Sequence, residues 1–129
     1  MNPPIIKNQN KKEWNMRKLN TLKKNYEFRY VLSKGQYYRG KYLTVYIKKN
    51  NSNKNYIGIA INTKLGKAVR RNNAKRLIRE NYRLLKDELI LGNSIIFLWN
   101  KNVNIEDADF FELKNEMKKI FHKAELFKK

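Results

Sequence analysis

Residues 66–85 read GKAVRRNNAKRLIRENYRLL and predict a helix with two chemically opposite faces. At about 100° per residue, apolar side chains gather on one arc of this helix, and cationic side chains gather on the opposite arc. The apolar arc holds Ala74, Leu77, Ile78, Leu84 and Leu85. The opposite arc holds Arg71, Asn72, Lys75, Arg76, Arg79 and Arg83. We therefore expect a helix from about Ala68 to about Leu89 that packs on one face and presents positive charge on the other.

The positive charge of this segment is dense. Its cations are Lys67, Arg70, Arg71, Lys75, Arg76, Arg79 and Arg83. Like charges four residues apart repel and destabilise an isolated helix by a few tenths of a kcal/mol per pair. Phosphates offset such repulsion, and the planar guanidinium group of arginine can bind two phosphate oxygens at once. A solvated surface helix is the alternative, but such a helix usually mixes charges of both signs.

Charge along the whole chain indicates the same kind of partner. The 129 residues include 30 Lys and Arg against 11 Asp and Glu, which gives a net charge of +19. Self-repulsion at that level opposes a compact state, so a polyanion is the expected partner. A membrane surface would require a long amphipathic helix with an exposed apolar face, and no segment has that pattern. Nucleic acid is therefore favoured over a membrane.

Length and composition limit the protein class. The chain has the length of one domain. Its longest apolar run, residues 95–99, is too short to cross a membrane, and the N-terminus lacks the apolar region of a secretory signal. The absence of cysteine excludes disulfides and thiolate sites and fits a reducing interior. We expect a cytoplasmic protein.

The first residues differ from the rest. Residues 1–20 are polar and basic without clear periodicity, so we expect a flexible basic arm followed by a single RNA-binding domain over residues 21–129. Met16 is an alternative start that would make residues 1–15 a mis-assigned segment. The sequence leaves these two readings open.

Periodicity outside residues 66–85 predicts the other elements. Residues 41–48 and 56–62 alternate between apolar and polar or small side chains, and the polar loop between them suggests a β-hairpin. Residues 94–99 are apolar without alternation, which indicates a strand buried on both faces. The predicted order is a helix over 25–34, a short strand or turn at 37–40, strands over 41–48 and 56–62, the helix above, a strand over 94–99, and a helix from 107 or 109 to about 126. We interpret this α-β-β-β-α-β-α order as an α+β two-layer sandwich with helices on one side of a small sheet.

A known family has a matching signature. Residues 66–80 strongly resemble the signature G-x-A-V-x-R-N-R-x-K-R-x-x-R-E of the protein component of bacterial ribonuclease P. The matched positions are Gly66, Ala68, Val69, Arg71, Asn72, Lys75, Arg76, Arg79 and Glu80. Asn73 departs from it, because the family usually has arginine there, and asparagine can donate a hydrogen bond to RNA but carries no charge. Residues 22–28 are similar to the family's L-K-K-x-x-x-F, and residues 57–64 are similar to its strand G-x-x-V-S-x-K.

The resemblance implies a fold and a function. It implies a fold like the second domain of ribosomal protein S5, with a left-handed β-α-β crossover, against the usual right-handed rule. It also implies an accessory subunit that binds a catalytic RNA and precursor tRNA, assists removal of the 5′ leader, and leaves hydrolysis to the RNA with Mg²⁺. No catalytic residue, protein-held metal or small-molecule substrate is expected.

Two RNA-binding surfaces are expected. The phosphate contacts would come from Lys67, Arg70, Arg71, Asn72, Lys75, Arg76, Arg79 and Arg83. A cleft between the first helix and the sheet would receive the leader through Phe28, Tyr42, Tyr46 and Lys48. Aromatic rings beside cations suit single-stranded RNA, and Gly58 and Ala60 would leave that sheet face open. Ordinary packing is the alternative for each aromatic, and Leu32 stands where the family often has an aromatic.

Two other functions are compatible with a small basic chain. A structural ribosomal protein would be equally basic and would bind ribosomal RNA without a role in cleavage. A protein-only endonuclease would need clustered carboxylates to hold metal. The acids Glu106, Asp107 and Asp109 lie at a predicted helix start, where capping explains them, and His122 lacks a partner that would make it a general base.

Overall fold

The computed structural model describes residues 19–129. Most of the expected basic arm, including Met16, lies outside the described residues. Leu19 and Asn20, which the prediction assigns to the arm, lie against the domain. The backbone N–H of Ile57 donates to the carbonyl of Asn20, and the N–H of Leu22 donates to the carbonyl of Ile57, both at 2.9 Å. This segment therefore covers part of one sheet edge.

The elements follow the expected order α-β-β-β-α-β-α. They are α2 (Asn25–Lys34), β1 (Gln36–Arg39), β2 (Leu43–Lys49), β3 (Tyr56–Ala60), α3 (Ala68–Leu85), β4 (Asn93–Trp99) and α4 (Phe110–Lys123). Short 3-10 turns at Thr63–Leu65, Lys86–Glu88 and Ile105–Asp107 join some of them. The mixed α+β class is confirmed.

One four-stranded sheet has the order β1-β2-β4-β3. β2 pairs antiparallel with β1 and with β4, whereas β3 and β4 are parallel. The predicted hairpin between residues 41–48 and 56–62 is therefore wrong, because β4 lies between these two strands. The physical reason is that β4 is apolar on both faces and almost wholly buried, so it takes a central place.

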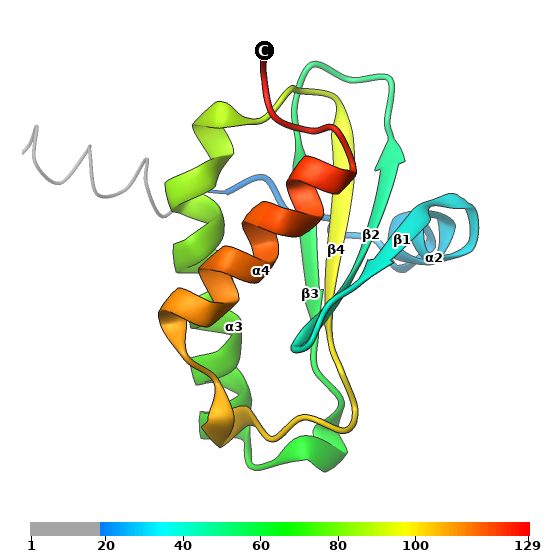
Figure 1. Cartoon of the computed structure of the whole chain (residues 1–129). Helices are drawn as coiled ribbons and strands as arrows, with labels where there is room; N and C mark the ends of the chain where they lie inside the picture. Colours follow the sequence, from blue (N-terminus) through cyan, green and yellow to red (C-terminus); the bar gives the residue numbers. More distant parts are fainter. Residues whose placement is uncertain (1–18) are drawn as a thin grey trace, which may run out of the picture.

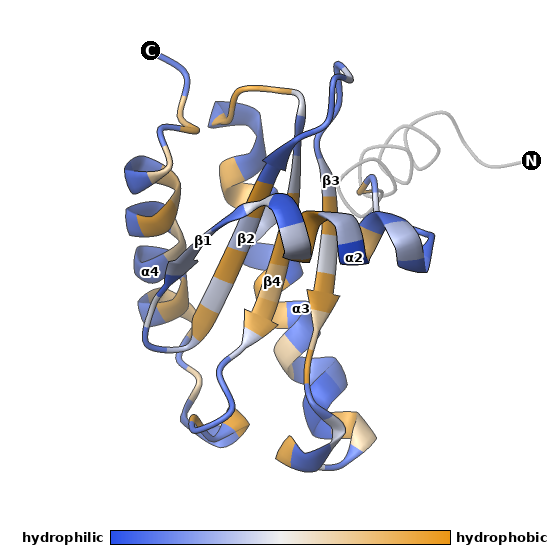
Figure 2. Ribbon diagram, turned by 90° about the vertical axis from the view of Figure 1, so that its right-hand side faces the viewer, coloured by the Kyte–Doolittle hydropathy of each residue, from blue (hydrophilic) through white to orange (hydrophobic). Residues whose placement is uncertain are grey.

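The connection from β3 through α3 to β4 is left-handed, as the resemblance implies. In Figure 2, β3 and β4 both point downward, α3 lies behind the sheet, and β4 lies to the left of β3. A right-handed crossover would place β4 on the other side of β3. This unusual turn carries α3 across the face of the sheet next to its β3 edge.

The helices lie on both faces of the sheet. α3 and α4 cover one face, and α2 covers the other (Figure 1). The prediction that helices lie on one side only is therefore wrong. The second face needs cover because it also has apolar side chains at its centre: Ile96 is fully buried there, and Val31 of α2 is 3% exposed.

The main core lies between the sheet and α3 with α4. From α3 it takes Ala74, Ile78, Tyr82 and Leu85. Leu84 was predicted to join them but is 53% exposed, so that prediction is wrong. The buried arc is rotated toward Tyr82, whose ring meets Phe97 edge-on at 6.0 Å between centroids. A large aromatic ring buries more surface than a leucine and fixes the rotation of the helix.

A carboxylate joins α4 to the β1–β2 turn. Glu116 accepts hydrogen bonds from the backbone N–H groups of Lys41 at 2.7 Å, Tyr42 at 3.0 Å and Leu43 at 2.8 Å. Gly40 makes room for it, because a Cβ there would lie 2.4 Å from the Glu116 carboxyl carbon. Charge-assisted bonds of this kind are stronger than neutral ones.

We predict that Glu116→Ala lowers the free energy of unfolding by about 2 kcal/mol, because three N–H groups lose a charged acceptor. Urea unfolding followed by circular dichroism measures the effect. Glu88→Ala is the control, since the side chain of Glu88 is exposed. Equal stability of the two variants would show that water replaces the carboxylate without cost.

Candidate nucleic-acid interface

Three cations form a row along α3, which we call the cationic row: Arg71, Lys75 and Arg79. They follow one another at four-residue spacing and lie next to the buried row of Ala74, Ile78 and Tyr82. All three are half-buried. Their stems therefore pack at the margin of the core while the charged ends can reach solvent. The sequence prediction that α3 has a core face and a cationic face is confirmed.

Acids engage few of the predicted phosphate ligands. Arg70 forms an ion pair with Glu106, and Arg76 lies 3.8 Å from Glu80. Within residues 19–129, neither Lys75 nor Arg79 forms an ion pair. The Nε of Arg71 donates to the carbonyl of Gly66 at 3.1 Å, which ties it to the start of α3. Of the other candidates, Lys67 and Asn72 are exposed and Arg83 is half-buried; Asn73, which replaces the family's arginine, is exposed as well.

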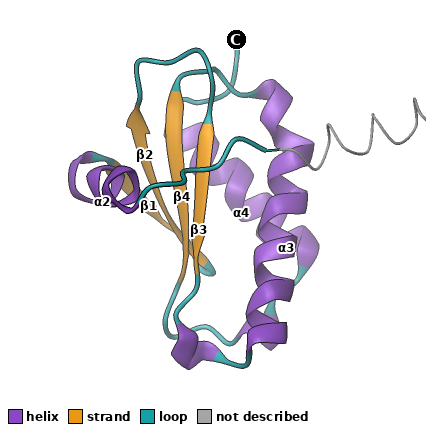
Figure 3. Cartoon of the chain, turned by 180° about the vertical axis from the view of Figure 1, so that it is seen from behind, coloured by secondary structure: helices purple, strands orange, loops and turns teal. Residues whose placement is uncertain are grey.

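The cationic row lies on the side of α3 that faces away from α4. The opposite side meets α4, since the side-chain amide of Asn81 donates to the carbonyl of Phe110 at 3.3 Å. Figure 3 shows α3 in front of α4 on the side of the molecule where β3 forms the sheet edge. The charged ends therefore lie near that edge and not between the two helices.

The α2 face of the sheet carries a second candidate surface, which we call the open face: Phe28, Thr44, Tyr46, Ala60 and Leu98. Cross-strand register places Tyr46 beside Ile96 and Gly58, and Thr44 beside Leu98 and Ala60. All five residues of the open face are half-buried. The ring of Phe28 lies over Gly58, where a Cβ would come within 2.6 Å of Cε2. The prediction that Gly58 leaves this face open is therefore wrong, because the ring of Phe28 fills the space and Gly58 is buried, whereas Ala60 stays half-buried.

Sequence reasoning missed Tyr37. It lies opposite Tyr46 in the β1–β2 pair, and their ring centroids are 5.7 Å apart with 34° between the planes. Tyr37 is 65% exposed. The signal was available only through the register of β1, which a four-residue strand does not reveal. The pair extends the aromatic surface from β2 to the β1 edge.

Tyr42 does not lie on the open face, so its predicted place is wrong. It is 1% exposed and belongs to the main core. Its hydroxyl lies 2.6 Å from a carboxylate oxygen of Glu112, and this hydrogen bond, together with burial, raises the pKa of Tyr42 to about 12. The physical reason is that β2 begins at Leu43, so the alternation of the strand does not extend to Tyr42.

Lys48 lies on the predicted face of the sheet. It shares a sheet face with Tyr46, two residues away, as alternation predicts. However, it lines a hollow next to Tyr26 and Tyr30 of α2, and neither Tyr46 nor Phe28 lines that hollow. Its contact with the leader therefore stays a prediction, with Tyr26 and Tyr30 lining the same hollow.

The remaining candidates for chemistry have structural roles or are isolated. A carboxylate oxygen of Asp109 accepts from the N–H of Phe111 and caps α4, as predicted. His122 is exposed. Over residues 19–129, no cluster of three or more His, Asp or Glu side chains could hold a metal ion. No helix in the described part of the chain is both long and apolar enough to span a bilayer.

Comparison with known proteins identifies the family of this chain. Residues 16–125 match the family model described as Ribonuclease P. A protein of Thermoanaerobacter sp. (strain X514), named "Ribonuclease P protein component", is 39% identical over 111 residues, which cover 86% of this chain and 94% of the relative. A protein of Clostridioides difficile with the same name is 39% identical over 106 residues, covering 81% of this chain and 91% of the relative.

Solved structures agree. The RNase P protein of Staphylococcus aureus superimposes with a TM-score of 0.75 at 29% identity, covering 86% of this chain and 100% of that structure. The RNase P protein of Thermotoga maritima gives a TM-score of 0.73 at 26% identity, covering 81% and 96%. These matches favour ribonuclease P over a structural ribosomal protein. The chain belongs to the ribonuclease P protein family and is thus an accessory subunit of the endoribonuclease that matures the 5′ end of tRNA, in which the RNA carries out catalysis.

Proposed function

We propose that the chain binds the catalytic RNA of ribonuclease P and the 5′ leader of precursor tRNA through two different surfaces. The observation that carries this proposal is the cationic row, in which Lys75 and Arg79 have no acidic partner within residues 19–129. Repulsion among cations that lack acidic partners lowers the stability of the folded protein, and RNA phosphates would offset this repulsion on binding.

The first surface is the cationic row with its neighbours on α3. Arginine and lysine ends in solvent would bind phosphates of the catalytic RNA and tRNA, and the flanking candidates Lys67, Arg70, Asn72, Arg76 and Arg83 would extend the contact. Arg70 would have to exchange Glu106 for a phosphate. That exchange is feasible because both side chains are more than half exposed, where an ion pair contributes little.

The second surface is the open face, which would hold the leader. Half-buried aromatic rings at Phe28 and Tyr46 offer stacking platforms for unpaired bases. Contacts to the leader exist in the precursor and vanish in mature tRNA. Such contacts would therefore favour substrate over product.

The protein would supply no metal site of its own. We propose Mg²⁺ as the ion of the reaction, held mainly by the RNA component, because the described residues provide no carboxylate cluster suited to it. We also propose a cytoplasmic location, a single RNA-binding domain over residues 21–129, and no small-molecule substrate.

Reconstitution tests the proposal. The protein alone should leave precursor tRNA uncut, whereas the protein with its cognate catalytic RNA should release a leader and mature tRNA at a low Mg²⁺ concentration at which that RNA alone is slow. Gel electrophoresis of labelled precursor tRNA measures cleavage. Cleavage by the protein alone, or no stimulation of the RNA, would refute the proposed role.

The cationic row makes a quantitative prediction about salt. Lys75→Ala and Arg79→Ala should each lower the slope of log affinity against log salt by about one, because each removes one phosphate contact. Fluorescence anisotropy with the catalytic RNA at several salt concentrations measures the slope. Lys118→Ala on the exposed side of α4 is the control and should leave it unchanged. An unaltered slope in the α3 variants would remove them from the phosphate contacts.

For the open face, we predict that Tyr46→Ala weakens binding of precursor tRNA by roughly tenfold and leaves mature tRNA binding nearly intact, because one stacking contact to the leader is lost. Binding of both RNAs to the reconstituted enzyme gives the ratio. Phe111→Ala, which removes a 68% exposed ring from α4, is the matched control. An equal loss for both RNAs would instead assign Tyr46 a packing role.

A further inference from the structure

A hollow of about 630 Å³ lies between α2 and the end of β2, and Phe28 does not line it. We call it the α2 hollow; its wall on the helix includes Tyr26, Arg29 and Tyr30, and its wall on the sheet includes Lys48, Lys49 and Ser94. Neither Tyr46 nor any other residue of the open face lines it. Apart from Lys48, which the sequence analysis expects in the leader cleft, the residues that line this hollow are not among the leader contacts proposed above.

Two tyrosines in the α2 hollow have no packing role that explains them. Tyr26 is 65% exposed and Tyr30 is 53% exposed. They are four residues apart on a helix, so their rings lie on the same side, one turn from each other. Within residues 19–129, neither hydroxyl makes a hydrogen bond. Exposure of two neighbouring aromatic rings to water is unfavourable, and such pairs are typical of surfaces that bind a planar group.

Positive charge surrounds these rings. Arg29, Lys48 and Lys49 line the hollow, and Lys24 places its Nζ 5.6 Å from the ring centroid of Tyr26. The lining acid is Glu27, and its carboxylate already accepts from the backbone N–H of Lys24 at 3.2 Å. The charge balance therefore favours a polyanion and disfavours a cationic or neutral ligand.

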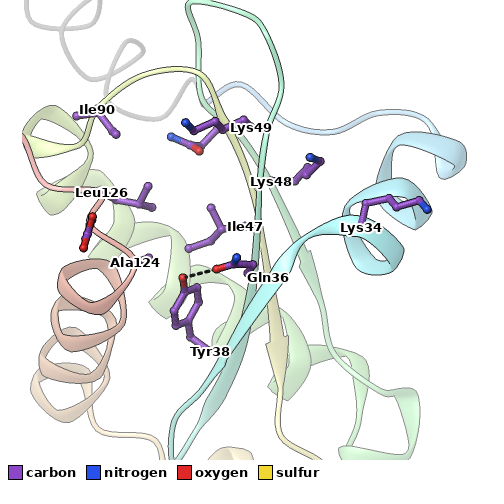
Figure 4. A pocket seen from close by; sticks show the side chains of 11 residues that line it. Lys34, Gln36, Tyr38, Ile47, Lys48, Lys49, Ile90, Ala124 and Leu126 are labelled. Carbon is purple, nitrogen blue, oxygen red and sulfur yellow. Dashed lines mark hydrogen bonds between the residues drawn. The ribbon is translucent and has the colours of Figure 1, made fainter.

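The positive charge continues beyond the hollow. Lys48 and Lys49 also line a second hollow, at the β1–β2 edge near the end of α4 (Figure 4). There Lys34 adds a further cation and Glu125 adds one acid, so cations still outnumber acids. The hydroxyl of Tyr38 donates a hydrogen bond to the side-chain oxygen of Gln36 at 3.1 Å. A chain of phosphates leaving the α2 hollow would thus meet cations in this direction.

We infer that the α2 hollow binds single-stranded RNA, with bases stacked on Tyr26 and Tyr30 and phosphates near Arg29, Lys48 and Lys49. Its occupant would be the part of the leader farther from the cleavage site than the part on the open face. This inference rests on the proposed leader binding and adds a second site to it. Double-stranded RNA does not fit, because paired bases cannot reach the rings.

The arrangement of α2 makes a continuous path between the two sites. Tyr46 and Lys48 are two residues apart on β2, which is about 7 Å along the strand, and α2 crosses the sheet above this region (Figure 2). An RNA strand that passes from the open face over α2, about 10 Å in diameter, would reach the hollow by way of Arg29. A few nucleotides span that distance.

Leader length provides the test. We would measure binding of precursor tRNAs with leaders of about 5 and about 20 nucleotides to the reconstituted enzyme, since single-strand sites typically cover 4–16 nucleotides. The double variant Tyr26→Ala/Tyr30→Ala should weaken binding of the long-leader RNA by about tenfold and leave the short-leader RNA unchanged. Tyr26→Phe/Tyr30→Phe keeps the rings and should bind like the parent. Phe111→Ala, another exposed aromatic, should alter neither.

Crosslinking supplies an independent measurement on the unaltered protein. 4-Thiouridine placed in the distal leader should crosslink to the α2 peptide that contains Tyr26 and Tyr30, identified by mass spectrometry. Absence of that crosslink would overturn the inference, as would equal affinity of the alanine variant and the parent for the long leader. An equal loss for both leaders would also overturn it and would indicate contact with the tRNA body or catalytic RNA. If the leader does not bind the protein at all, Tyr46→Ala will also fail to weaken precursor binding more than mature tRNA binding. That result would count against the proposed function, whereas failure of the α2 variant alone would count only against this inference.

Discussion

Burial of one side of α3 against the sheet is the interaction on which the rest of the structure depends. The cations of α3 repel one another by a few tenths of a kcal/mol per pair at four-residue spacing. Burial of Ile78, Tyr82 and Leu85 contributes about 1.5–3 kcal/mol each, so the core outweighs the repulsion several-fold. The helix can therefore keep Lys75 and Arg79 without an acidic partner among residues 19–129, and their charges remain available to a polyanion.

The size of α2 explains why the other face of the sheet stays accessible. A helix of 10 residues is about 15 Å long, whereas β2 and β4 have seven residues each and extend over about 23 Å. α2 crosses the strands and covers a strip at Gly58 and Ile96. Sheet residues on either side of this strip remain partly exposed. The same short helix thus creates the open face on one side and the α2 hollow on the other.

Much of this arrangement could be predicted from periodicity, because a single face or a single strand decides it. The two faces of α3 and the burial of β4 follow from residue spacing alone. The errors arise where several elements act together. Leu84 and Tyr82 compete for the core, and the position of α4 and the ring of Phe97 settle the rotation of α3. The pairing of β2 with β4 depends on which strand most needs burial on both faces, and a local hairpin pattern does not contain that information.

The same holds for individual site residues: local spacing predicts some of them, and the others depend on neighbouring elements. Lys75 and Arg79 were predicted correctly as part of a cationic face because that assignment needs only helical spacing. Tyr42 was misplaced because its position depends on where β2 begins, and that start is fixed by the contacts of Glu116 with the turn before it. Lys48 follows strand alternation correctly and also lines a hollow beside α2. Its neighbours are therefore Tyr26 and Tyr30, which no strand pattern could indicate.

Strand register connects the proposed RNA-binding surfaces rigidly. The row Tyr46, Ile96 and Gly58 runs across three hydrogen-bonded strands to the seat of Phe28, and the core beneath the same strands holds α3. The aromatic surface and the cationic row therefore cannot move independently without breaking the sheet or the core. Fixed spacing means that RNA bound on α3 would already have its leader aligned with the open face, so little further ordering of the protein would be needed on binding. A precursor could then gain contacts on both surfaces, while a mature tRNA would gain contacts on one, and this difference is what an accessory subunit without catalytic groups can contribute.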